Sequence, residues 1–183
     1  LWSTSAMSNS LDRKIAVIDD SLDPTRVEGR ALAEILSSQK SSSRNSISTG
    51  AEVTFAYFSP NELSTLRPKD FDALIIGNLN KSAIELSWSA SKKILCEFSD
   101  ESKPIGAIGG GITLVASSLG PEVEVSSVQH PDSLIETLKK LKANTVTCRA
   151  SDHLSDRDNK VLSTAGEKIA GVQGLLRELI EMA

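Results

Sequence analysis

Short apolar runs alternate with segments of helical periodicity along most of the chain. Strand-like runs cover 14–18, 52–58, 73–76, 104–108, 123–125 and 145–148, and helical patterns cover 27–36, 83–98, 112–119, 132–141 and a final stretch that ends at Met182. Because parallel strands need a crossover between them, this alternation predicts an α/β fold: a mostly parallel sheet with helices on both faces, in three layers. Residues 152–164 predict a small hairpin with its turn at 156–159. Capping boxes are predicted at 59–63, where a short helix begins, and at 164–167, where the final helix begins. Trp88 is predicted on the apolar face of the helix at 83–98.

The chain divides into a short arm and one domain. Residues 1–12 are Ser-rich without an apolar pattern, which predicts a flexible N-terminal arm, and 13–183 are expected to form a single domain. Within that domain, half of the residues in 37–50 are serine, which predicts a solvated loop. The first residue is Leu1, so either Met7 is a start codon or a transit peptide has been removed. We favour the transit peptide and expect a mitochondrial location, with a cytoplasmic one as the alternative.

Composition excludes several classes of function. A formal net charge of −4 and a pI of 5.3 argue against binding to a nucleic-acid backbone. No run approaches the roughly 18 apolar residues that a membrane span needs. Two cysteines and two histidines are too few for a disulfide scaffold or a metal cluster. We therefore expect no nucleic-acid partner, no membrane span, no metal and no cofactor.

The stretch IGAIGGGITLVA, residues 105–116, predicts a buried strand that turns directly into a buried helix. Such turns hold a phosphate at the helix N-terminus or display a nucleophile on a sharp elbow. Here no acid, thiol or hydroxyl stands at the turn, and GAIGGG matches neither common glycine-rich nucleotide motif. Since ligands bind at the carboxyl ends of parallel strands, residues 19–23, 77–80 and 109–111 are the candidate site.

Two resemblances compete. The stretch IAVIDDS at 15–21 resembles the first strand of a response-regulator receiver domain, whose paired acids hold magnesium, which makes Asp19 and Asp20 a weak metal candidate. That family carries its phospho-accepting aspartate where this chain has Gly77, so the resemblance does not supply the phosphotransfer chemistry.

The second resemblance covers about 14–182. DFDALIIGNLN and KPIGAIGGGITLVASSLG are similar to the middle of the ThiJ/PfpI superfamily, which has the class I glutamine-amidotransferase-like fold. The C-terminal stretch, in which DRDNKVLST precedes the last helix, resembles the ElbB-like, glyoxalase-annotated branch and its mitochondrial relatives. The resemblance implies a flavodoxin-like sandwich.

The same resemblance implies a vestigial catalytic site. The family places its nucleophilic cysteine in the position that Gly109 fills, where a turn at a helix N-terminus lowers the pKa of the thiol. Glu28, offset by about one position, is the nearest match to the glutamate that contacts that thiol, and Gly77 matches the loop that supplies an oxyanion-hole amide. Glycine keeps a positive-φ turn at little cost but has no nucleophile. Gly111, at the start of the helix, is expected to tolerate alanine.

Other reactive residues are expected to be structural. Cys96 and Cys148 are predicted to be inert core or strand residues, His130 a helix cap and His153 a surface residue, and Thr113 and Ser126 have no base that the sequence identifies.

The sequence therefore favours a catalytically inactive protein that serves as a structural or accessory subunit of a larger complex, in contact with other protein subunits. The sequence leaves open whether the protein also forms a homodimer. The alternatives are a glyoxalase- or deglycase-like enzyme with a displaced catalytic residue, and an anion- or nucleotide-binding module at the glycine turn.

Overall fold

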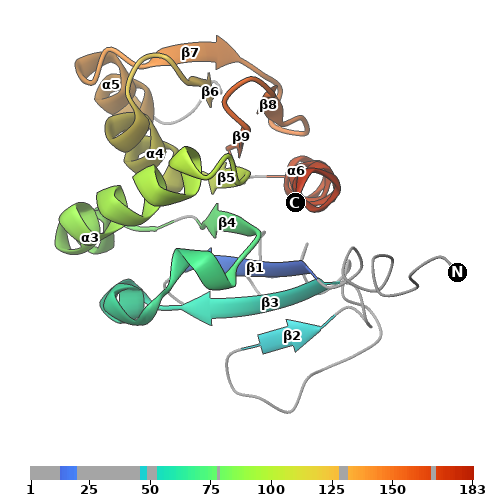
Figure 1. The fold of residues 1–183 in the computed structure, drawn as a ribbon. Coiled ribbons are helices and arrows are strands. Elements are labelled where there is room, and N and C mark those ends of the chain that lie inside the picture. The colour runs from blue at the N-terminus through green and yellow to red at the C-terminus, as the bar shows by residue number, and fades with distance from the viewer. Residues whose placement is uncertain (1–12, 20–45, 49–52, 78, 128–131, 166–167) are drawn as a thin grey trace, which may run out of the picture.

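The computed structural model describes residues 13–19, 46–48, 53–77, 79–127, 132–165 and 168–183. Within these residues, seven strands form one sheet in the order β2-β3-β1-β4-β5-β9-β8 (Figure 1). The strands are β1 (Arg13–Ile18), β2 (Ser46–Ser48), β3 (Val53–Phe58), β4 (Ala73–Ile76), β5 (Ile105–Ile108), β8 (Leu154–Asp156) and β9 (Val161–Thr164). The five from β3 to β9 are parallel, and the edge strands β2 and β8 are antiparallel to their neighbours. The predicted α/β fold is confirmed.

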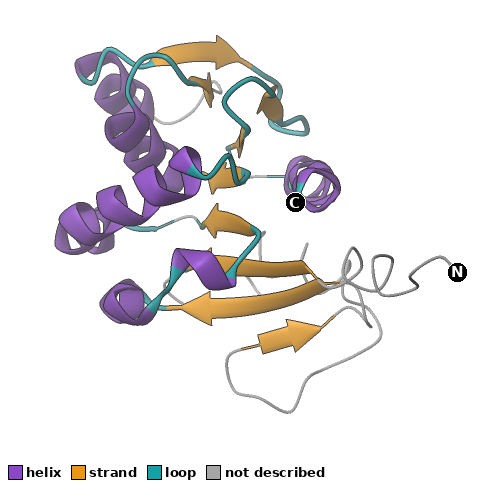
Figure 2. Ribbon diagram, in the orientation of Figure 1, coloured by secondary structure: helices purple, strands orange, loops and turns teal. Residues whose placement is uncertain are grey.

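Helices lie on both faces of this sheet. Figure 2 shows α3 (Lys81–Asp100) and α4 (Gly111–Leu119) on one side of the column of strands and α6 (Ile169–Met182) on the other. Alternate residues of each buried strand face opposite ways: Ala16 packs with the core under α3 and α4, and Val17 packs with the core under α6. Each central strand is therefore a continuous apolar run, as expected for strands buried on both faces.

A second, two-stranded sheet lies beyond the main one. It pairs β6 (Glu124–Ser127) with β7 (Asn144–Thr147) in parallel, and α5 (Asp132–Lys140) connects them. Side chains join it to the main sheet: the Glu124 amide donates to Asp156 Oδ2 at 2.9 Å, and the Ser126 amide donates to Ser163 Oγ at 2.8 Å. The sequence predicted both strands but not that they leave the main sheet.

Most predicted elements lie within two residues of the observed ones. The short helix η1 (Pro60–Thr65) begins with the predicted capping box, in which the Ser59 amide donates to the Glu62 carboxylate at 2.8 Å. It is followed by η2 (Pro68–Asp70). The hairpin of β8 and β9 is also confirmed, with its turn at 157–160.

Two local predictions are wrong. Part of the stretch 37–50, predicted as a loop, is the strand β2, which pairs with β3 because Ile47 stands between polar residues in the alternation that an edge strand shows. Trp88, predicted on the buried face of α3, is 37% exposed. The buried face of α3 centres near Ser91, and Trp88 lies about 60° from it around the helix, at the rim.

The predicted capping box at 164–167 is wrong as well. Thr164 is the last residue of β9, and its hydroxyl donates to Asp152 O at 3.0 Å instead of capping a helix. The helix α6 begins after Lys168, which makes no side-chain cap. Glu167, the other half of the predicted box, lies outside the described residues.

Candidate functional site

The turn from β5 into α4 has the predicted geometry. Gly109 has φ 55°, in the left-handed region that glycine occupies without steric cost. Gly110 follows as the N-cap of α4 with φ −59°, and Thr113 Oγ1 donates back to Gly110 O at 2.6 Å. The strand therefore passes into the helix through a single left-handed residue, and that residue has no side chain.

Gly111 brings α4 against the end of β4. A Cβ built on Gly111 would lie 2.7 Å from both Gly77 O and Ile76 O, closer than real Cβ contacts come. The expectation that Gly111 tolerates alanine is therefore wrong, because the crowding comes from the neighbouring strand and not from helix propensity. The first turn of α4 rests directly on the sheet backbone.

The amides of Gly77 and Gly109 already have main-chain acceptors. The Gly77 amide donates to Ile18 O at 2.8 Å, and the Gly109 amide donates to Thr164 O at 2.9 Å. An oxyanion hole requires N–H groups that point at the substrate oxygen. Neither of these two N–H groups can contribute to an oxyanion hole while the sheet is intact.

Asp19 follows β1 at the carboxyl edge of the sheet, beside Gly77. The winding of the sheet reverses between β1 and β4, which is where open α/β sheets bind ligands. The Asp19 side chain is 8% exposed, and a Cβ on Gly77 would lie 3.0 Å from Asp19 Cγ. Burial, and then the nearby Asp19 carboxylate, raise the pKa of Tyr57 above its usual value. A carboxyl group thus lies at the mouth of the candidate site.

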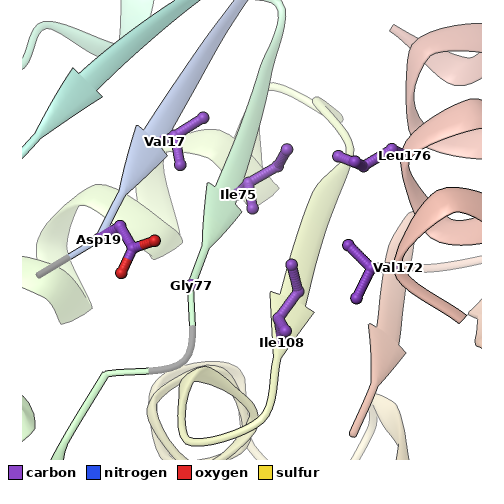
Figure 3. Close-up of a pocket in the computed structure, with 7 residues that line it drawn as sticks. All are labelled: Val17, Asp19, Ile75, Gly77, Ile108, Val172 and Leu176. Carbon is purple, nitrogen blue, oxygen red and sulfur yellow. The ribbon is translucent and has the colours of Figure 1, made fainter. Parts of the chain in front are cut away.

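Figure 3 shows the cavity next to this carboxylate. Its apolar walls come from β1, β4, β5 and α6, and the lining residues are Val17, Asp19, Ile75, Gly77, Ile108, Val172 and Leu176. The cavity has a volume of ≈ 10 Å³, about the space that the centre of one water molecule occupies. The walls leave no room for an organic substrate.

The remaining candidates at this edge lie outside the described residues. These are Glu28 and Asp20, the proposed thiol partner and the second acid of the weak metal candidate. Among the residues that the structure does describe, no group of three or more His, Cys, Asp or Glu side chains is placed to hold a metal ion. The same part of the chain contains no helix long and apolar enough to cross a membrane.

Both cysteines are free thiols away from the elbow. Cys96 is half-buried, and its thiol lies 3.8 Å from Ser118 O, between α3 and α4. Burial, followed by the Asp152 charge, raises the pKa of Cys148. A raised pKa keeps the thiol protonated and a weak nucleophile at neutral pH, so Cys148 is not an activated nucleophile.

His153, predicted as a surface residue, lies instead against α6. Its Nε2 is 2.5 Å from Glu178 Oε2, and a Cβ on Gly174 would lie 2.9 Å from its Nδ1. Glu178 also accepts hydrogen bonds from Ser155 Oγ at 2.7 Å and Arg157 at 2.9 Å. Burial opposes ionisation, but these donors together with the His153 and Arg157 charges lower the pKa of Glu178. The cluster fastens β8 to α6 across 20 or more residues of sequence, which no local pattern signals. His130 lies outside the described residues.

Replacing Gly109 by alanine is expected to reduce the free energy of unfolding by about 1 kcal/mol, because a side chain at positive φ is strained. Gly109→Asn should cost less, since asparagine adopts the left-handed region more readily. Urea denaturation of the two variants and the wild type measures the difference. Equal stability of all three proteins would contradict the left-handed turn.

Comparison of the sequence with protein-family models and with curated proteins finds no match. Solved structures do match. An isoprenoid biosynthesis protein with an amidotransferase-like domain from Ehrlichia chaffeensis superposes with a TM-score of 0.63 at 14% identity, over 93% of this chain and 99% of that one. Drosophila melanogaster DJ-1beta superposes with a TM-score of 0.60 at 15% identity, over 94% of this chain and 91% of that one. A ThiJ/PfpI domain protein from Brachyspira murdochii superposes with a TM-score of 0.59 at 10% identity, over 94% of this chain and 96% of that one.

These similarities extend along nearly the whole of each chain. The protein therefore has the fold of the ThiJ/PfpI and DJ-1 proteins, the flavodoxin-like, amidotransferase-like α/β class that its sequence resembles. At such low identity the likeness establishes the fold and leaves activity to be inferred from this chain's own site.

Proposed function

We propose that the chain is a catalytically inactive protein of this fold that serves as a structural or accessory subunit of a larger protein complex in the mitochondrion. The observation that carries the proposal is Gly109. It keeps the left-handed turn at which the superfamily places a nucleophile, and it has no side chain that could react.

Three further observations support the absence of catalysis. The amides of Gly77 and Gly109 are engaged with main-chain carbonyls, so they cannot stabilise a developing oxyanion. The cavity at the carboxyl edge has a volume of ≈ 10 Å³. The pKa of Cys148 is raised, which leaves its thiol poorly activated. The fold is thus kept while the chemistry is lost, and a scaffold role makes use of the fold alone.

The two alternatives receive less support. A glyoxalase- or deglycase-like enzyme needs a displaced nucleophile, and Cys96 and Cys148 both lie outside the lining of the cavity at the carboxyl edge. An anion or nucleotide at the glycine turn would have a carboxyl group in its surroundings, because Gly111 packs against Gly77 and Asp19 lies beside Gly77. A carboxylate opposes the binding of a second negative charge.

Purified protein is therefore expected to convert methylglyoxal to lactate no faster than buffer does. Gly109→Ala and Cys148→Ser variants, as matched controls, should give the same background rate. Native mass measurement on the endogenous protein should find it in an assembly several times its own mass of 19.5 kDa. Turnover that Cys148→Ser abolishes would support the displaced-residue enzyme instead. An endogenous protein that is only a monomer or a dimer would contradict the subunit role.

A further inference from the structure

β7 is an outer strand of the molecule with an open edge. Among the described residues its only strand partner is β6, in the register from Glu124 opposite Asn144 to Ser127 opposite Thr147. Figure 1 shows β7 at the periphery, with β6 between it and the hairpin of β8 and β9. The outer edge of such a strand presents main-chain N–H and C=O groups that can pair with another strand.

Among the strands that the structure describes, β6 covers the edge of β8, and none covers the outer edge of β7. β8 is the last strand of the main sheet, but β6 packs beside it. The buried Asp156 side chain of β8 accepts a hydrogen bond from the Glu124 amide of β6. β7 has the sequence NTVT, without proline or charge, and only Val146 in it is half-buried. Threonine and valine favour extended backbone. β7 itself therefore has no proline and no charged side chain, two of the devices that usually keep an edge from pairing.

Positive charges flank this edge at both ends. Lys139, Lys140 and Lys142 precede β7 and Arg149 follows it, and all four are exposed. No acidic residue stands between Lys139 and Arg149, although the whole chain has a formal net charge of −4. The charge along this stretch of sequence is thus opposite in sign to that of the molecule, and it flanks the four residues of β7 on both sides. The paired strand β6 has one exposed acidic residue, Glu124, in register with Asn144.

We propose that β7 is a docking edge for an extended, acidic segment of a partner protein, which adds to β6–β7 as a third strand. Main-chain hydrogen bonds would supply the pairing, and acidic residues on either side of the segment would meet Lys142 and Arg149. A third strand also stabilises the sheet, because two strands alone are marginal.

A second copy of the chain fits this edge less well. If two β7 strands paired antiparallel about a two-fold axis, the start of each would face the end of the other, which brings the positive side chains before one strand near Arg149 after the other. Like charges in that position are destabilising. The charge pattern therefore selects a partner of the opposite sign. The proposal extends the proposed function by describing one subunit contact, but it depends on β7 alone and not on the state of the elbow.

The test uses a fluorescent synthetic peptide in which alternating valine and threonine are flanked by two glutamates at each end. Fluorescence anisotropy should show binding, and amide resonances of Thr145, Val146 and Thr147 should shift on titration. The double variant Lys142→Glu with Arg149→Glu should weaken binding about tenfold or more, since two exposed charge pairs turn repulsive. Lys92→Glu with Lys93→Glu, which changes exposed charge on α3 by the same amount, is the control and should leave affinity unchanged.

Two further peptides isolate the pairing itself. A peptide with alternate backbone amides methylated keeps its charge but cannot pair, and it should bind at least about tenfold more weakly. A peptide with lysines in place of glutamates should not bind. Absence of binding by the acidic peptide, resonance shifts away from β7, or equal weakening by the α3 control would overturn the proposal. So would a concentration-dependent dimer that the single change Lys142→Glu strengthens, because that change alone sets opposite charges against each other across the two-fold axis. None of these results depends on methylglyoxal turnover, which tests the proposed function separately.

Discussion

Replacing Gly111 by alanine is expected to lower the free energy of unfolding by about 3 kcal/mol, at the upper end of the cost of overpacking a core. The added Cβ would lie 2.7 Å from Gly77 O and from Ile76 O. These atoms belong to the backbone at the end of β4, so they cannot rotate out of the way as a side chain would. Relief requires α4 to move away from the sheet, which loosens the packing of a helix whose residues 111–116 are buried.

Urea denaturation compares Gly111→Ala with Gly110→Ala. Gly110 has φ −59°, which any residue adopts, so its alanine variant should lose less than about 1 kcal/mol. The two variants make the same chemical change one residue apart. Helix propensity favours alanine at Gly111, whereas the N-cap position of Gly110 prefers glycine slightly, so propensity alone would make Gly111→Ala the milder change. A Gly111→Ala protein as stable as the wild type would show that α4 does not press on β4.

Replacing Asp156 by alanine is expected to lower the free energy of unfolding by about 2–3 kcal/mol, because it leaves several hydrogen-bond donors without their acceptor. The Asp156 carboxylate accepts hydrogen bonds from the Glu124 amide at 2.9 Å, the Asn159 side chain at 2.9 Å and the Asn159 amide at 3.2 Å. It is 8% exposed. It thus holds the hairpin turn together and fastens β6 to the main sheet. Thermal denaturation measures the loss, and Asp158→Ala, which removes an exposed charge from the same turn, should have little effect.

The contribution of Asp156 should also depend on pH. Burial alone would raise its pKa, but the hydrogen bonds from Glu124, Asn159 and Asp158 hold the pKa below its usual value. The folded protein therefore binds a proton less readily here than the unfolded chain does, so the stabilisation is complete above the unfolded pKa of about 4 and is lost as the pH falls below it. The stability difference between wild type and Asp156→Ala should be constant at neutral pH and shrink in acid. A difference that grows in acid would contradict this sign.

The sequence predicts the sheet well because its central strands are buried on both sides. The run at Ala73–Ile76 consists only of apolar residues, and a strand covered on both faces needs that pattern. The positive φ of Gly109 could be predicted for a similar reason: a sharp turn between a buried strand and a buried helix has few solutions, and glycine is the residue that meets them most easily.

What the sequence could not predict depends on contacts between distant residues. Gly111 looks like an ordinary glycine at a helix start, and only the approach of β4 makes its missing Cβ necessary. His153 looks like a loop residue until α6 brings Glu178 to 2.5 Å from it. Trp88 satisfies a helical pattern, yet it falls just outside the strip of α3 that the sheet covers. In each case the deciding neighbour lies in another element.

The way in which β6 is attached predicts that β6 and β7 differ from the central strands in local stability. β5 and β9 are joined by a four-residue ladder, whereas β6 is joined to the main sheet through the Asp156 and Ser163 side chains. Fewer bonds have to break to release β6–β7 with α5 than to separate the central strands. Val125 and Leu138 are buried in the core under α3 and α4, so opening this part also exposes apolar surface. We expect amide exchange to be faster in β6 and β7 than in the central strands, because local stability varies across a fold.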